Sequence, residues 1–174
     1  MSDVSMRLAE IEDKLKRVTD ELEILQVIAA YGIAADSMSG DAYQNLYTQD
    51  CIFDVPGVDH WEGAQEMKRL ITTDPRHHAL LNRGAAHVNS LPHIQIDGDK
   101  AIVTGYSRLY QSKEGPVHAM GSRGMDVLRV SAVRNEMVRG PKGWQIKKRT
   151  VLLLDGSEAP RKLLGSAFAT DGSN

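Results

Sequence analysis

The sequence lacks the features that cross-link a small protein or anchor a protein in a membrane. It contains a single cysteine, Cys51, so no disulfide can form within the chain. No apolar run reaches the roughly 20 residues that span a bilayer, and the N-terminus lacks the apolar block of a signal peptide. These absences predict a cytoplasmic protein with no membrane partner. At 174 residues, we expect a main domain that buries about 70% of its unfolded surface.

An excess of one charge is also lacking. The formal net charge is −2, from 21 basic and 23 acidic residues that are scattered among one another. A nucleic-acid surface would need clustered Lys and Arg, so we expect no nucleic-acid partner. The chain also lacks a Cys-x-x-Cys pair, a phosphate-binding loop, a dinucleotide fingerprint and a Gly-x-Ser-x-Gly elbow. No cofactor is therefore expected, and a small molecule or a protein partner fits better.

A seam of apolar residues, spaced alternately four and three apart, predicts one long amphipathic helix at the N-terminus. Its members are Val4, Leu8, Ile11, Leu15, Val18, Leu22, Leu25 and Ala29. The seam either packs on the core of the same chain or forms an oligomer contact. We assign residues 1–20 to an N-terminal helical extension, residues 21–164 to the main domain and residues 165–174, rich in Gly, Ser and Ala, to a flexible tail.

The remaining pattern places helices before strands. We expect helices over residues 41–47, residues 63–73 and from Pro75 onward, and strands over residues 51–55, 87–96, 101–110, 125–139 and 144–154. Turns at residues 97–99 and 140–143 separate the later strands. This order predicts an α+β fold in which a curved antiparallel sheet, shaped like a cone, wraps around the N-terminal helices.

Asp36 is the most informative polar residue, because it ends an otherwise apolar helix. A buried, ionised carboxylate needs a partner, and the best candidate is His87, which opens a strand. A carboxylate that accepts a hydrogen bond from one ring nitrogen prepares the other nitrogen to remove a proton. Tyr31 could donate a hydrogen bond to a carbonyl oxygen nearby. Five residues along a helix turn by about 140°, so Tyr31 and Asp36 share a cavity only if the helix end relaxes or the cavity wraps around it. The alternative is that Asp36 only ends its helix.

Other candidate residues have two interpretations each. Arg149 shares a strand face with Val151, so it either points inward to bind an anion or carbonyl, or outward to pair with an acid. Tyr110 either reaches the cavity or packs as an ordinary aromatic residue. His77 and His78 point about 100° apart on a helix, so we expect no metal site. His60 and His118 fall in expected loops, where solvated histidines are common.

Residues 22–154 resemble the SnoaL-like, scytalone-dehydratase-like group of the nuclear-transport-factor-like superfamily. The resemblance rests on five segments: Ile28-x-x-Tyr31-x-x-x-x-Asp36, Leu46-Tyr47-x-x-Asp50-Cys51-x-Phe53-Asp54, Trp61-Glu62-Gly63, His87 ahead of Asp97-Gly98-Asp99, and Gly143-Trp144-x-Ile146-x-x-Arg149. It implies a cone of curved sheet closed by helices. It also implies that Asp36 and His87 are a catalytic pair, with Tyr31 and Arg149 in the pocket.

The chain departs from the family pattern at several pocket positions. Val133 stands near a usual tyrosine, Leu91 replaces a frequent asparagine, Tyr110 stands where some dehydratases have an acid, and Val55 lies near another pocket tyrosine. These departures affect substrate identity more than the Asp36–His87 pair.

The resemblance leads to a hypothesis for the function. It implies a cofactor-independent lyase or isomerase that removes a proton next to a carbonyl of a small hydrophobic cyclic substrate. His87 would be the base, Asp36 its orienting partner, Tyr31 a donor, and Arg149 or Tyr110 an aid to orientation or to leaving hydroxide. The alternatives are a non-catalytic binding or assembly subunit and a polyketide cyclase. We also expect a homodimer or a higher homo-oligomer, formed through the outer sheet face or the N-terminal seam.

Overall fold

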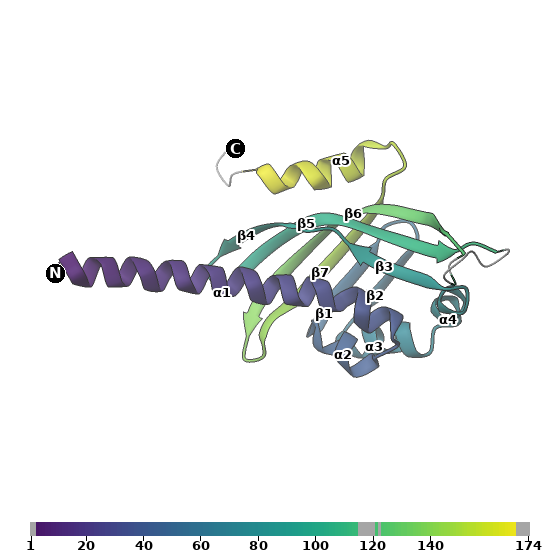
Figure 1. The fold of residues 1–174 in the computed structure, drawn as a ribbon, viewed down its shortest axis with the longest axis horizontal. Coiled ribbons are helices and arrows are strands. Elements are labelled where there is room, and N and C mark those ends of the chain that lie inside the picture. The colour runs from purple at the N-terminus through teal and green to yellow at the C-terminus, as the bar shows by residue number, and fades with distance from the viewer. Residues whose placement is uncertain (1–2, 115–120, 122, 170–174) are drawn as a thin grey trace.

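The computed structural model describes residues 3–114, 121 and 123–169, and it shows helices on both sides of a curved sheet (Figure 1). On one side lie α1 (Asp3–Asp36), α2 (Gly40–Asn45), α3 (Ala64–Thr72) and α4 (Pro75–Asn82). On the other side lie α5 (Glu158–Gly165) and a short 3₁₀ helix, η2 (Ser166–Phe168). This arrangement of helices against a curved sheet confirms the expected α+β cone. In the part of the chain described, no helix has the length and apolar character needed to cross a membrane.

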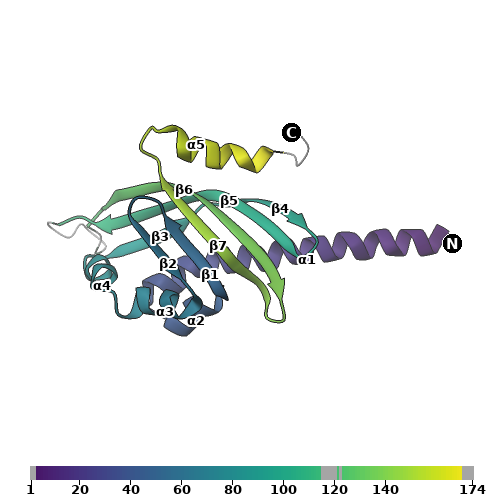
Figure 2. The same ribbon diagram turned by 180° about the vertical axis from the view of Figure 1, so that it is seen from behind.

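In the described residues, seven strands form the sheet. They are β1 (Tyr47–Val55), β2 (Asp59–Glu62), β3 (Ala85–Asn89), β4 (His93–Asp97), β5 (Lys100–Ser112), β6 (Met125–Gly140) and β7 (Gly143–Leu153). Their order is β2-β1-β7-β6-β5-β3, and β4 also pairs with β5. One pair corrects the expected antiparallel sheet, because β1 and β7 run parallel, as Figure 2 shows. Strand patterns in a sequence do not reveal which distant strands become neighbours.

Several elements differ from the sequence expectation. The single strand expected over residues 87–96 is two strands, β3 and β4, separated at residues 90–92, where Pro92 has no amide hydrogen to donate. His60 lies in β2 and not in a loop, whereas His118 lies outside the described residues. In the segment assigned to a flexible tail, Ala167 is buried within η2, and residues 170–174 lie outside the described part.

The second half of α1 packs on the concave side of the sheet. Its core-facing stripe contains Ile24, Ile28, Tyr31 and Ala35, all of them buried. Asp20 continues this stripe: it forms an ion pair with Arg139 of β6 and accepts a hydrogen bond from the Trp144 indole at 3.3 Å. Burial opposes ionisation of Asp20, but the bonds from Arg139 and Trp144 outweigh it and lower the pKa of its carboxyl group. Asp20 thus fixes the point where α1 joins the domain.

Candidate active site

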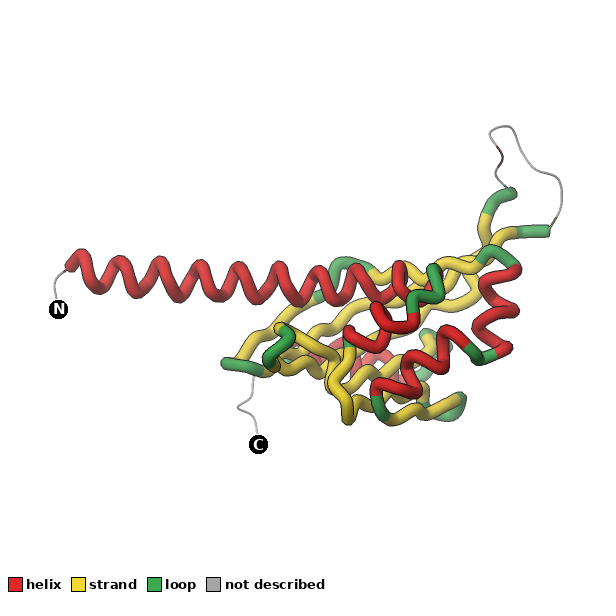
Figure 3. Tube along the Cα trace, turned by 90° about the horizontal axis from the view of Figure 1, so that it is seen from below, coloured by secondary structure: helices red, strands yellow, loops and turns green. Residues whose placement is uncertain are grey.

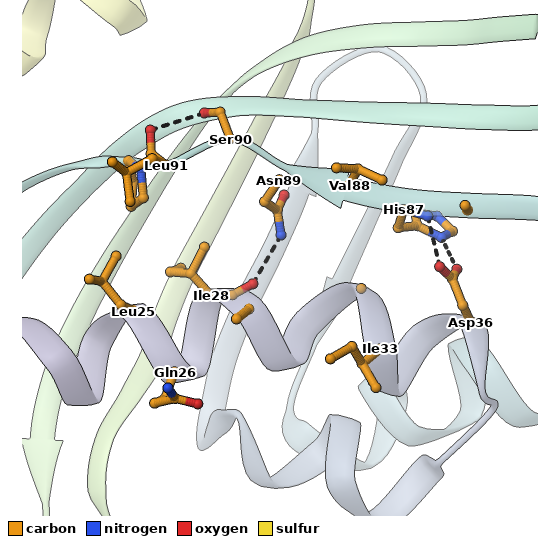
Figure 4. A pocket seen from close by; sticks show the side chains of 14 residues that line it. Leu25, Gln26, Ile28, Ile33, Asp36, His87, Val88, Asn89, Ser90 and Leu91 are labelled. Atoms are coloured by element: carbon orange, nitrogen blue, oxygen red, sulfur yellow. Dashed lines mark hydrogen bonds and ion pairs between the residues drawn. The ribbon is translucent and has the colours of Figure 1, made fainter.

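The last residue of α1 and an edge strand of the sheet meet at Asp36 and His87. Asp36 Oδ1 lies 2.6 Å from His87 Nδ1, and Asp36 Oδ2 accepts the backbone N–H of His87 at 2.8 Å (Figure 4). The two contacts hold the carboxylate and the ring in one orientation. With Nδ1–H donating to Asp36, a neutral His87 keeps its lone pair on Nε2. The expected hydrogen bond is present, and it leaves the second ring nitrogen available for proton transfer.

Gly32 allows this close approach of α1 and β3. A Cβ atom at this position would lie 2.2 Å from the backbone oxygen of His87. Real Cβ atoms do not come so close to backbone atoms, so any larger residue would separate the helix from the strand. The pairing of Asp36 with His87 therefore depends on a missing side chain one helical turn earlier.

His77 is a site residue that the sequence interpretation missed. Its ring stacks on the His87 ring, with centroids 5.8 Å apart and planes 28° apart. Its Nε2 lies 3.0 Å from the backbone oxygen of Ala35, the neighbour of Asp36. Burial lowers the pKa of His77, so a neutral ring donates this bond near pH 7. Its position three and four residues before Leu80 and Leu81, on the apolar side of α4, was the available signal.

A cluster of tyrosines lies beside the His87 ring. Tyr31 meets His87 edge to face, with centroids 6.4 Å apart, and Tyr43 lies 5.4 Å from Tyr31. The Tyr47 hydroxyl lies 3.4 Å from that of Tyr43. Burial raises the pKa of both Tyr43 and Tyr47, so these phenols stay protonated. Tyr31 and Asp36 approach the same histidine because β3 passes alongside the end of α1.

Arg149 points inward, which is one of the two orientations that the sequence allowed. It is 1% exposed, and its guanidinium lies 3.9 Å from the centre of the Tyr31 ring. Its Nη1 donates to Asn135 Oδ1 at 2.8 Å. The guanidinium thus supports the Tyr31 ring and is not among the described residues that line the adjoining cavity.

That cavity has a volume of about 200 Å³ and an apolar, aromatic wall. The wall includes Tyr31, Tyr43, Phe53, Trp61, His77 and His87. The lining also contains Arg76, which forms ion pairs with Asp59 at 2.7 Å and Asp74 at 2.8 Å. Arg129 also lines the cavity, and within the described residues it has no ion pair. An apolar cavity with a few polar groups is the usual form of a small-molecule site.

A larger hollow of about 500 Å³ lies on the outer side of the Asp36–His87 contact, between α1 and β3. Figure 4 shows Leu25, Ile33, Val88 and Leu91 along it. The His87 ring packs against Tyr31 and His77, and both of these line the inner cavity. The inner cavity is therefore the candidate active site, and the outer hollow is a groove beside it.

The structure does not bring Tyr110 to this cavity. Tyr110 pairs with Ala86 across the sheet, whereas the neighbouring pair is Leu109 with His87. Side chains alternate between faces along a strand, and directly paired residues share a face. Tyr110 therefore lies on the face opposite His87. Arg129 pairs with Leu109 and so shares the face of His87.

The fold is that of a SnoaL-like domain. The chain belongs to this family, because the family profile matches residues 16–150. A search of curated proteins found no match. Among solved structures, an NTF2-like protein with a cystatin-like fold from Novosphingobium aromaticivorans is 32% identical with a TM-score of 0.82, and the match covers 90% of this chain and 96% of that one.

Two further structures share the fold at lower identity. LinA is 15% identical with a TM-score of 0.63, over 80% of this chain and 89% of its own. A protein from Streptomyces avermitilis, described as a candidate dehydratase of the NTF2-like family, is 15% identical with a TM-score of 0.59, over 79% of this chain and 97% of its own.

Proposed function

We propose that this protein is a cofactor-independent lyase or isomerase that removes a proton next to a carbonyl of a small hydrophobic cyclic compound. The observation that carries the proposal is the bond between Asp36 and His87 Nδ1 at the wall of an aromatic cavity. A structural neighbour described as a candidate dehydratase supports the same reaction class. A simple binding pocket would not need an imidazole oriented in this way, so the geometry favours the enzyme over the binding-subunit alternative.

In the reaction, Nε2 of His87 takes the proton from the carbon next to the carbonyl. The C–H electron pair moves to form an enolate, and Asp36 stabilises the imidazolium that results. Tyr31, which lines the cavity, donates a hydrogen bond to the enolate oxygen. In a dehydration, the C–O bond at the next carbon then breaks, and the imidazolium returns its proton to the leaving hydroxide to form water. In an isomerisation, the same proton returns to another carbon.

Two arginines have separate roles in this proposal. The Arg149 guanidinium stacks on the Tyr31 ring and fixes its position. This cation–π contact contributes about 2 kcal/mol when the pair is shielded from water. Arg129 takes over the orienting role expected for Tyr110, because it lines the cavity without an ion pair among the described residues. It would bind a carbonyl or carboxylate at the far end of the substrate.

Exchange of carbon-bound protons with solvent tests the proposal before the natural substrate is known. Cyclic ketones of one to three rings are incubated with the protein in D₂O, and loss of the α-proton signals is followed by NMR. We expect exchange above the buffer rate that falls about 10²–10⁴-fold in His87→Ala. His78→Ala is the matched control, because His78 contacts the Thr72 backbone oxygen and does not line the cavity. Ketones that bind tightly without any exchange would favour the binding subunit.

A further inference from the structure

The first half of α1 projects beyond the sheet as an isolated arm, as Figure 3 shows. Its apolar residues at the predicted seam positions are largely exposed: Val4, Leu8, Ile11, Leu15, Val18 and Leu22 are between 53% and 73% accessible. A single helix gains little stability from propensity alone, and most helical stability in proteins comes from packing an apolar face. The arm therefore has an apolar face that its own chain leaves uncovered.

The seam also faces away from the core where α1 packs on the sheet. Core residues Asp20 and Ile24 each follow a seam residue, Val18 and Leu22, by two positions. Side chains that are two positions apart in an α-helix point about 160° away from each other around the helix axis. The seam and the core-facing stripe thus occupy nearly opposite sides of α1. Packing on its own core, one of the two interpretations of the seam, is not what the structure shows.

We propose that a second copy of this chain covers the α1 seam, and that the two α1 helices form an antiparallel two-stranded coiled coil. In the register with the longest overlap, Leu15 faces Val18 of the second copy, Ile11 faces Leu22 and Leu8 faces Leu25. Most of these layers thus pair a leucine with a β-branched residue. A parallel pair would stack leucine on leucine at one set of layers and β-branched residues at the other, a pattern typical of larger bundles.

The charges beside the seam select the same register. In an antiparallel pair, a residue that flanks the seam faces the same heptad position of the other helix, so that e faces e and g faces g. Lys14 then faces Glu21 of the second copy, and the symmetry repeats this contact. Glu12 faces Thr19, so no like charges meet. A shift by one heptad would instead set Lys14 against Lys14 and Glu12 against Glu12, which is unfavourable.

The area of the seam is sufficient for a stable dimer. Burial of one aliphatic side chain corresponds to roughly 60–120 Å² of apolar surface. The six exposed seam residues would then bury about 360–720 Å² per chain, and Leu25 and Ala29 add a smaller area, so that the total approaches the 800 Å² or so of a standard interface. The arm of the second copy would also extend over the outer groove beside Leu91, which is 84% exposed. The outer sheet face is less available, because α5 lies over part of it (Figure 1).

Light scattering of the full chain at micromolar concentration tests the association. We expect twice the 19.2 kDa mass of one chain. Leu15→Lys at a central layer should give the single-chain mass, and its folding should be intact because Leu15 is 64% exposed within one chain. Met6→Lys is the matched control on the same arm: it also removes an exposed apolar residue, but off the seam, and should remain a dimer. A monomeric parent chain, or a Leu15→Lys variant that stays dimeric, would overturn the proposal.

Disulfide cross-linking tests the orientation. Ile11→Cys and Leu22→Cys are prepared separately, mixed and oxidised; the native Cys51 is fully buried and does not compete. The mixture should form a linked dimer containing one chain of each variant. Cross-linking of Ile11→Cys with itself in equal yield would instead require a parallel pair and would refute the antiparallel register.

Discussion

Replacing Gly32 by alanine is the most direct test of how the fold positions Asp36 and His87. The added Cβ would lie 2.2 Å from the His87 backbone oxygen, whereas ordinary contacts begin near 3.4 Å. Helix and strand must therefore separate by about 1 Å. Overpacking of this kind destabilises by about 1–3 kcal/mol. Alanine recovers only about 0.5–1 kcal/mol through its better helix propensity, so the overpacking should dominate.

The expected result is a lower melting temperature together with a weaker site. A net loss of about 1–2 kcal/mol corresponds to a fall of roughly 2–8 °C for a chain of this length, measured by circular dichroism. Because the His87 amide donates to Asp36 at 2.8 Å, its hydrogen exchange should accelerate. A displacement of 1 Å can also lower catalysis about 10²-fold.

Gly165→Ala is the matched control for this prediction. Gly165 also has helical backbone angles, with φ −62°, but a Cβ there would meet nothing within 4 Å. This variant should be neutral or slightly more stable. If Gly32→Ala melts at the same temperature as Gly165→Ala and keeps slow exchange at His87, the argument from the close approach of α1 and β3 is wrong.

Further predictions concern single side chains. Asp20→Asn should destabilise by about 1–3 kcal/mol at pH 7, because it removes the charged partner of Arg139 and leaves this half-buried guanidinium with only the exposed Asp99. The pKa of Asp20 is lowered in the folded protein, so its contribution to the free energy of unfolding is complete above the ordinary carboxyl pKa near 3.9. This contribution is lost as the pH falls through the lower pKa of the folded protein, so the melting temperatures of the parent and the variant should converge below about pH 4. Asp36→Asn should lower ketone exchange about 10²–10⁴-fold with the fold retained; an unchanged rate would rule out the proposed base. Tyr110→Phe should leave exchange unchanged, and a tenfold loss would show that Tyr110 does reach the substrate. Arg149→Met should reduce both thermal stability and exchange, and a fully active variant would contradict its support of Tyr31.

The sequence by itself determined the parts of this protein that depend on local periodicity. The apolar spacing of α1, the turn at residues 97–99 and the alternation of β5 to β7 each predict one element from neighbouring residues. An acid at the end of an apolar helix and a histidine at the start of a strand also pointed to each other, because a carboxylate in such a place needs a partner.

Apart from Asp36 and His87, only the tertiary structure decided which distant residues became neighbours. The parallel pairing of β1 with β7, the stacking of His77 on His87 and the seat of Arg149 behind Tyr31 join segments whose separation leaves no periodic signal. The orientation of Tyr110 followed from its register with Ala86, and a shift by one residue would have reversed it. Gly32 was ordinary in the sequence, since its role lies in the closeness of another backbone.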